Sequence, residues 1–137
     1  MGRVINPEGA GKQRALLQKS VVLALRELSN QEAVGDTTKD LAAYLVLSLR
    51  AIAVTIDVSV GAWEKRGYWL KADRFRLEWD WADTLGRSME QALQKDDWQK
   101  VALTAAQIAQ KVNRVSLPRR NRLGTPWEGA WKKLMKA

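Results

Sequence analysis

The sequence predicts an all-α protein, arranged as an antiparallel four-helix bundle followed by a short basic C-terminal helix. Apolar residues recur at alternating three- and four-residue spacing through most of the interior, which is typical of amphipathic helices. Pro is absent between Pro7 and Pro118, so no proline interrupts this periodicity. With 137 residues, 46% of them hydrophobic, the chain is long enough for one domain with a buried core.

The first two helices are predicted from periodicity and from their end signals. The first spans about Gly11–Ser29, and residues 1–10 are expected to form a flexible N-terminal arm. The second begins near Thr37, which is followed three residues later by Asp40 in a variant of the capping box. We expect Gly67 to end it, because glycine adopts the left-handed conformation that commonly follows a helix.

The second helix is expected to be the central and most buried one, since only Arg50 and Asp57 are charged within Leu41–Trp63. This stretch is about as long as a membrane-spanning helix, which needs roughly 20 residues. Two charges in mid-span make that alternative costly. The β-branched run Val54–Val60 would suit a strand, but the helical periodicity on both sides favours a helix.

The third helix is predicted over Tyr68–Gln94 as one continuous element, and the fourth from Asp96 or Asp97 to Pro118. An aspartate at either position can accept a hydrogen bond from a free N–H of the first helical turn. Apolar residues along the third helix form a seam that is typical of a bundle. The seam consists of Ala72, Phe75, Trp79, Ala82, Gly86, Met89 and Leu93, and a second stripe of Leu70, Leu77, Trp81 and Leu85.

A short fifth helix is predicted near the C-terminus from three start signals. Thr125 suits the N-cap, Pro126 the first helical position and Glu128 the third. We therefore divide the chain into a helical bundle over residues 1–117 and a basic linker with a C-terminal amphipathic helix over residues 118–137.

The excess positive charge is concentrated near the C-terminus. The formal net charge is +8. Residues 111–137 hold eight cations against one anion, whereas residues 1–110 hold fifteen cations against fourteen anions. A basic segment of this kind suggests an anionic partner, and backbone phosphate contacts with DNA or RNA are our leading hypothesis. The expected nucleic-acid-binding residues are Arg114, Arg119, Arg120, Arg122, Lys132 and Lys133.

Tryptophan is the second unusual feature, with seven Trp against one Phe and two Tyr. Beside cations, exposed indoles can stack on the bases of single-stranded nucleic acid or anchor a protein partner. The simpler alternative is that they cap the ends of the bundle, with cationic side chains against their faces. The C-terminal helix likewise either folds back onto the bundle or contacts a partner. The candidate stacking or partner-binding residues are Trp63, Trp69, Trp127 and Trp131.

Four charged residues of the second and third helices are expected to form structural ion pairs. Arg50 and Asp57 are seven residues apart, as are Arg76 and Asp83, so each couple shares one helix face. If the chain turns near Gly67, antiparallel packing brings Asp57 near Arg76 and Arg50 near Asp83. Two pairs of opposite polarity would then specify the register of the helices.

Composition argues against most catalytic chemistry. The chain has no Cys and no His, which excludes thiolate nucleophiles and histidine acid–base catalysis and leaves zinc and di-iron sites without their usual ligands. The segment Gly9–Gln13 departs from the phosphate-loop pattern, which requires glycine and a hydroxyl residue where this chain has Asn6 and Gln13. We therefore expect a non-enzymatic binding protein with no cofactor and no metal.

The expected role is that of a nucleic-acid-associated accessory protein or complex subunit. The alternative is a protein-interaction adaptor, or a homo-oligomeric helical bundle, that uses a Trp-rich face. Docking of the basic C-terminal helix to an anionic membrane is less favoured, although its composition also suits that role. The N-terminal sequence Met1–Pro7 has no apolar signal region, so a cytoplasmic protein is expected.

Overall fold

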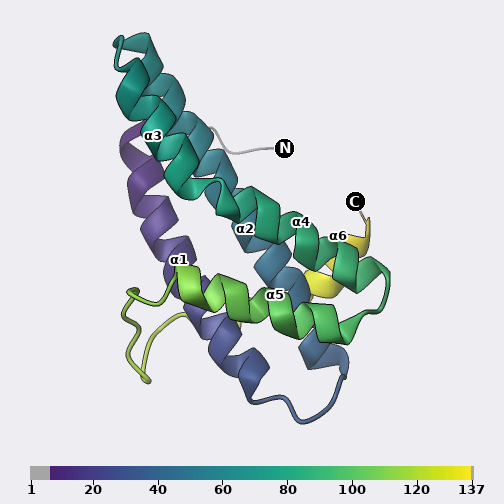
Figure 1. Ribbon diagram of the computed structural model, residues 1–137. Helices are drawn as coiled ribbons and strands as arrows, with labels where there is room; N and C mark the ends of the chain where they lie inside the picture. The colour runs from purple at the N-terminus through teal and green to yellow at the C-terminus, as the bar shows by residue number, and fades with distance from the viewer. Residues whose placement is uncertain (1–6, 137) are drawn as a thin grey trace.

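The computed structural model of the protein describes residues 7–136, and its helices confirm the predicted all-α class. The described residues contain six α-helices and no β-strand (Figure 1). The run Val54–Val60 is helical, as the surrounding periodicity predicts. The helices are α1 (Pro7–Ser29), α2 (Asp36–Lys65), α3 (Trp69–Trp79), α4 (Trp81–Gln94), α5 (Trp98–Lys111) and α6 (Ala130–Lys136).

The long helix α2 is the centre of the fold, as its low charge content predicts. α1, α3, α4 and α6 all pack against it, whereas α5 packs chiefly on α4. Leu41, Leu45, Leu49 and Ile52 are fully buried, and burial of each contributes about 2 kcal/mol of hydrophobic free energy. α2 is long and apolar enough to cross a membrane, yet 56% of its most apolar stretch is buried inside the protein, as in a core helix.

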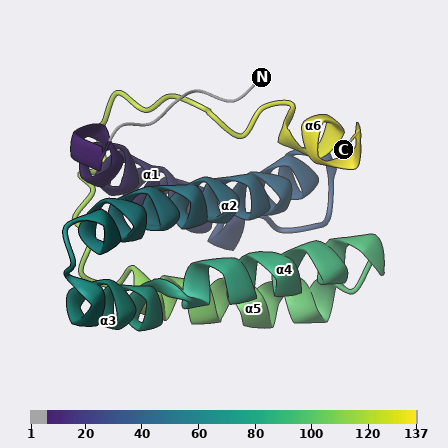
Figure 2. The ribbon, with the colours of Figure 1, turned by 90° about the horizontal axis from the view of Figure 1, so that it is seen from above.

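The other helices lie on two sides of the α1–α2 pair (Figure 2). α3, α4 and α5 cover one side, and α6 covers the other. Residues 112–129 join α5 to α6, so this linker passes round α1 to cross from one side to the other. The buried side chains of the helices and of the linker belong to one continuous core.

The third predicted helix is interrupted at Asp80, so the prediction of one continuous helix over Tyr68–Gln94 is wrong. The Asp80 carbonyl accepts hydrogen bonds from both the backbone N–H and the hydroxyl of Thr84, at 3.2 Å each. Hydroxyl bonding of this kind often bends helices. The rings of Trp79 and Trp81 stack with their centroids 5.6 Å apart. Residues two positions apart do not face each other on a regular helix, so this contact accompanies the break.

The predicted seam of the third helix faces the core along both α3 and α4. Its aromatic members are half-buried, and the second stripe divides between the two helices. Trp81 and Leu85 of α4 pack against the core, whereas Leu70 and Leu77 of α3 are exposed. The fully or nearly fully buried seam residues are Ala72, Ala82, Gly86, Met89 and Leu93.

Two helix ends follow their local sequence signals. Asp97 caps α5 by accepting a hydrogen bond from the Lys100 N–H at 3.1 Å, as predicted. Gly67 follows α2 with a φ of 80°, in the left-handed region that suits glycine, which confirms the predicted stop. Both signals are local, because each depends on residues within one turn of the helix end.

Two other helix ends differ from the prediction. α1 begins at Pro7, because proline lacks the N–H that the first helical turn leaves unpaired. Residues 7–10 are therefore helical and are no part of a flexible arm, while residues 1–6 of the expected arm lie outside the described residues. α5 ends at Lys111, well before Pro118, and the chain then turns toward α1.

The start of α2 also differs from the expected capping box. α2 begins at Asp36, with Gly35 as the N-cap. The Gly35 N–H donates to Thr38 Oγ1 at 3.1 Å, so the capping hydroxyl comes from Thr38 and not from Thr37. The carboxylate of Asp40, which was expected to complete the box, instead binds the C-terminal segment.

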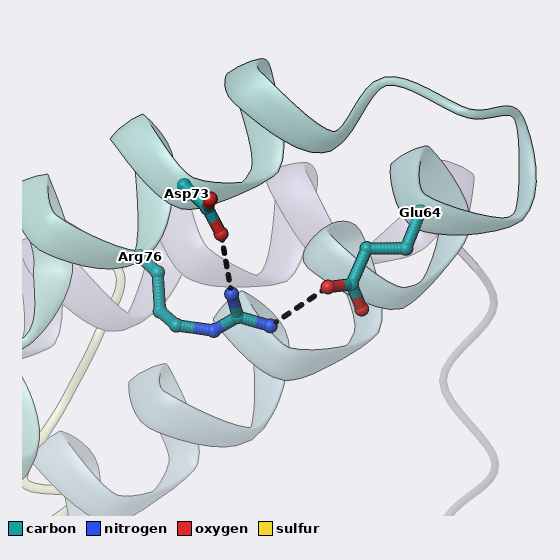
Figure 3. Close-up of polar contacts among 3 residues, drawn as sticks. All are labelled: Glu64, Asp73 and Arg76. Atoms are coloured by element: carbon teal, nitrogen blue, oxygen red, sulfur yellow. Dashed lines mark hydrogen bonds and ion pairs between the residues drawn. The ribbon is translucent and has the colours of Figure 1, made fainter.

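The predicted pair of Asp57 with Arg76 is not formed. The Arg76 guanidinium lies between two other carboxylates, Glu64 of α2 and Asp73 of α3, with N–O distances of 3.1 Å each (Figure 3). Asp57 is exposed on α2 and takes part in no ion pair among the described residues. Arg76 therefore joins α3 to the last turn of α2.

The predicted pair of Arg50 with Asp83 is also replaced. Arg50 binds Glu90, and Asp83 binds Arg87 along α4 at 3.1 Å. In both arginine pairs the partner lies seven residues, or two helical turns, further along the chain than expected. Side chains on a helix lean toward its N-terminus, so these long side chains meet acids that are displaced from the nearest Cα positions.

The closest approach of α4 to α2 generates a stability prediction. A Cβ atom built on Gly86 would lie 3.3 Å from Leu49 Cβ, which is tight for two atoms of the packed core. We expect Gly86→Val to lower the free energy of unfolding by about 1–3 kcal/mol, because the larger side chain forces the helices apart. Urea unfolding followed by circular dichroism measures this change.

Gly61→Val is the matched control. Gly61 lies in α2, and a Cβ atom there would meet nothing within 4 Å. Its free energy of unfolding is expected to change by less than about 0.5 kcal/mol. Equal losses in the two variants would contradict the close approach of α4 and α2 at Gly86.

Candidate nucleic-acid interface

The basic linker between α5 and α6 is held on the surface by hydrogen bonds at its middle. Arg26 of α1 donates to the carbonyl of Leu117 at 2.9 Å and to that of Pro118 at 3.5 Å. Asn121 closes a local turn, since its side-chain amide donates to the Pro118 carbonyl and its Oδ1 accepts from the Leu123 N–H, both at 3.1 Å. These contacts position the arginines on either side of Asn121.

All six predicted phosphate-binding cations are exposed. Among the described residues none of them takes part in an ion pair, whereas Arg50, Arg76 and Arg87 of the helical body each bind a carboxylate. The linker and α6 therefore carry positive charge that the protein itself does not neutralise. The exposed cations are Arg114, Arg119, Arg120 and Arg122 in the linker, and Lys132 and Lys133 in α6.

A single carboxylate holds the start of α6 against α2. Asp40 Oδ2 accepts from the Gly129 N–H at 3.1 Å, and Asp40 Oδ1 accepts from the Trp131 N–H at 2.9 Å. An acidic group at a helix N-terminus also interacts favourably with the helix dipole. Nothing in the local sequence around Asp40 indicates this role, because its partners lie about 90 residues further along the chain.

The start of α6 differs from the prediction. α6 begins at Ala130, whereas Thr125, Pro126 and Glu128 belong to the preceding turn. Thr125 Oγ1 does bond Glu128 Oε1 at 2.9 Å, so the two residues meet without starting a helix. Gly129 has a φ of 81°, and this left-handed residue separates the turn from the helix.

The two C-terminal tryptophans dock α6 on the body of the protein. Trp127 is 93% buried, so its ring is not available for stacking on a base while α6 is docked. Trp131 is partly buried, and Lys39 of α2 lies with Nζ 5.5 Å from its ring centroid. Leu134 completes the buried face of α6. Of the two alternatives for the C-terminal helix, the structure shows that it folds back onto the other helices.

The other two candidate tryptophans lie near the turn between α2 and α3, at the far end of α2 from α6 (Figure 1). Trp63 meets the Phe75 ring edge-on at 4.8 Å and has Lys71 Nζ 4.5 Å from its centroid, so protein groups already contact it. Trp69 is 60% exposed. The structure therefore separates the tryptophans at this turn from the basic segment near the C-terminus.

Comparison of the chain with protein-family models, with curated proteins and with solved structures gives no match. The function is therefore inferred from the placement, exposure and charge of the side chains described above.

The Asp40 contact generates a prediction about the order of the basic segment. Asp40→Ala removes the acceptor of two backbone N–H groups, and we expect a loss of about 1–2 kcal/mol in the free energy of unfolding. Hydrogen exchange of the α6 amides should accelerate, because the helix start loses its anchor. Exchange followed by mass spectrometry measures the effect peptide by peptide.

Asp57→Ala is the control for this variant. Asp57 is also an acid of α2, but it is exposed and binds no cation among the described residues. It should leave the exchange of residues 130–136 unchanged. If both variants exchange alike in α6, Asp40 does not anchor the C-terminal segment.

Proposed function

We propose that the protein is a nucleic-acid-associated accessory protein or complex subunit that contacts phosphates through its C-terminal basic segment, residues 111–137. The observation that carries this proposal is the group of six cations in the linker and α6, all exposed and unpaired among the described residues. Lys and Arg in such a state bind phosphate with release of counterions from the nucleic acid.

The shape of the segment supports contact with the phosphate backbone more than with base edges. Arg119, Arg120 and Arg122 fall within four residues of a linker that Arg26 fixes to α1. Guanidinium groups bind phosphate oxygens through paired hydrogen bonds. Binding of this kind depends on charge and not on the nucleotide sequence, so the same surface can bind either DNA or RNA.

The helical body provides the scaffold for this segment. We propose that α1, α2, α4 and α5 form an antiparallel four-helix bundle. The contacts of α1 with α2, α2 with α4, α4 with α5 and α5 with α1 support it, because they close a ring of four helices. In this arrangement α6 and the linker lie outside the ring, on the α1–α2 side.

A protein-interaction role is the second candidate, favoured by the exposed aromatic and aliphatic side chains at the α2–α3 turn. Tyr68, Trp69 and Leu70 are each more than half exposed there. This surface lies apart from the basic segment, so the two roles do not exclude each other.

The nucleic-acid proposal is tested by substituting three of the four linker arginines together: Arg119→Gln, Arg120→Gln and Arg122→Gln. We expect the full chain to bind a fluorescent oligonucleotide of about 20 nucleotides. Its affinity should fall steeply as salt rises from about 50 to 200 mM. The triple variant should bind more weakly and should lower the slope of log affinity against log salt by about two. Fluorescence anisotropy measures both quantities.

A triple variant of Lys12, Lys65 and Lys95 to Gln is the charge-matched control. These three exposed cations lie on α1, α2 and the α4–α5 turn. Substitution is preferable to truncation after Leu117, because truncation would remove α6 and uncover α2. Equal losses in the two triple variants would show that binding follows net charge alone, and no binding at low salt would overturn the proposal.

A further inference from the structure

The turn between α2 and α3 lies at the far end of α2 from α6 (Figure 1), and a groove is lined by residues of this turn and of α3. It is a shallow, open groove with a volume of about 840 Å³. Its aromatic lining consists of Trp63, Tyr68, Trp69 and Phe75, and Leu70 also lines it. Lys71 and Arg74 are its cationic members.

The apolar side chains around this groove are unusually exposed. Trp69 is 60% exposed and Leu70 64%, and both line the groove; Leu77, further along α3 and outside the groove lining, is 73% exposed. Ala72 of α3 is fully buried, Phe75 and Trp79 are half-buried against the core, and the other residues of this helix are exposed. Exposed apolar groups of this size, gathered on one helix, mark an interaction surface more often than single scattered residues do.

The aromatic lining of the groove is held from behind by a partly buried arginine. Arg14 of α1 lies with its guanidinium carbon 4.9 Å from the Phe75 ring centroid. It also donates to the carbonyl and hydroxyl oxygens of Thr55 in α2, at 3.3 and 3.2 Å. Burial lowers the pKa of Arg14 from its ordinary value, but the group stays protonated at neutral pH. Phe75 is therefore fixed between Arg14 and Trp63, and the groove is preformed.

Cations outnumber acids around the rim, and two of the acids share a cation of α3. Glu64 and Asp73, the two carboxylates nearest the turn, both bind Arg76 (Figure 3). Arg66 and Arg74 are exposed and take part in no ion pair among the described residues. Lys71 contacts Trp63 and likewise binds no acid there. Among the described residues, Glu78 is the one carboxylate that lines the groove, so cations predominate around it.

We propose that this groove binds an acidic amphipathic segment of a partner protein. Apolar side chains of the segment would enter between Trp63 and Trp69, and its carboxylates would meet Arg66, Lys71 and Arg74. This is the helix-in-groove mode of peptide recognition, in which apolar anchors give affinity and flanking charges give selectivity.

The observations favour a polypeptide over other anionic partners. Leu70 and Leu77 are the most exposed apolar residues of α3, and aliphatic side chains offer no stacking surface to a nucleic acid base. The site is a concave groove, whereas interfacial docking to lipid is made by the continuous apolar face of an amphipathic helix. The proposal is independent of nucleic-acid binding, because it uses none of the cations of residues 111–137.

The test is a selection of linear peptides of about twelve residues, displayed on phage, against the full-length protein. We expect the selected peptides to carry Asp or Glu around Trp, Phe or Leu anchors. A synthetic peptide of the selected sequence should bind at least about tenfold more weakly to the Trp69→Ala/Leu70→Ala variant. Arg74→Glu should weaken it as well, because it reverses one charge of the rim. Fluorescence anisotropy measures the affinities.

Matched variants outside the groove test whether the loss of peptide binding is specific to it. Leu103→Ala removes an apolar side chain of α5 with the same 64% exposure as Leu70, and Lys95→Glu reverses an exposed charge at the α4–α5 turn. Neither should change the affinity, and nor should the triple linker variant. Selection of no peptides, of basic peptides, or of peptides that bind Trp69→Ala/Leu70→Ala equally well would overturn the proposal. Binding of phosphatidylserine vesicles or single-stranded DNA that is lost in that variant, without acidic peptides, would also overturn it.

Discussion

The apolar surface of α2 extends around most of the helix, and the rest of the fold depends on covering it. Leu41, Ala42 and Ala43 are consecutive and all fully buried. Because successive residues of a helix are about 100° apart, these three span about 200° of its circumference. No single neighbour can cover such an arc. α4 therefore packs on one side of α2 and α6 on the other, with α1 alongside.

The need to cover α2 explains the structural role of the residues after α5. A four-helix arrangement alone would leave the α6 side of α2 open, and the buried residues Trp127, Ala130 and Leu134 close it. The C-terminal segment is thus part of the core through its apolar side chains and part of the surface through its cations. Asp40 lies near the start of α2 and Arg26 near the end of α1. Asp40 anchors the start of α6, and Arg26 holds the linker.

Local signals made much of the fold predictable. The stop at Gly67 and the cap at Asp97 depend on neighbours within one helical turn, and the structure confirms both. The central place of α2 followed from its lack of charge, and the burial of Met89 and Leu93 followed from periodicity. Each of these features is determined by a short stretch of sequence.

The features that the sequence did not predict depend on distant contacts. The Asp40 carboxylate was assigned to its own helix start, since nothing local points to a partner about 90 residues away. The break at Asp80 accompanies the stacking of Trp79 on Trp81, which helical periodicity cannot anticipate. The arginine pairs were displaced by two turns, because Cα spacing ignores the reach and lean of the side chain.

The candidate site was predicted only in part, because it also depends on contacts between distant residues. The exposure of the six basic-segment cations agrees with a phosphate-binding role, and composition alone had singled them out. Composition did not predict which tryptophans are buried and which are exposed. Trp127 is buried and Trp69 is exposed, although both lie beside cations in the sequence. Only the packing partners of each ring distinguish a core indole from a surface one.

The two proposed surfaces are separated along both α1 and α2. Asp40, which anchors α6, and Trp63, which lines the groove, are 23 residues apart on α2, or about 35 Å. Arg26, which holds the linker, and Arg14, which lies behind the groove, are 12 residues apart on α1, or about 18 Å. The Debye length at physiological ionic strength is about 8 Å, so phosphates bound at one end hardly affect carboxylates bound at the other. A nucleic acid and an acidic protein segment, which would compete for one basic surface, can therefore be held at the same time. Under the two proposals, this separation would allow one protein to connect a nucleic acid to a protein partner.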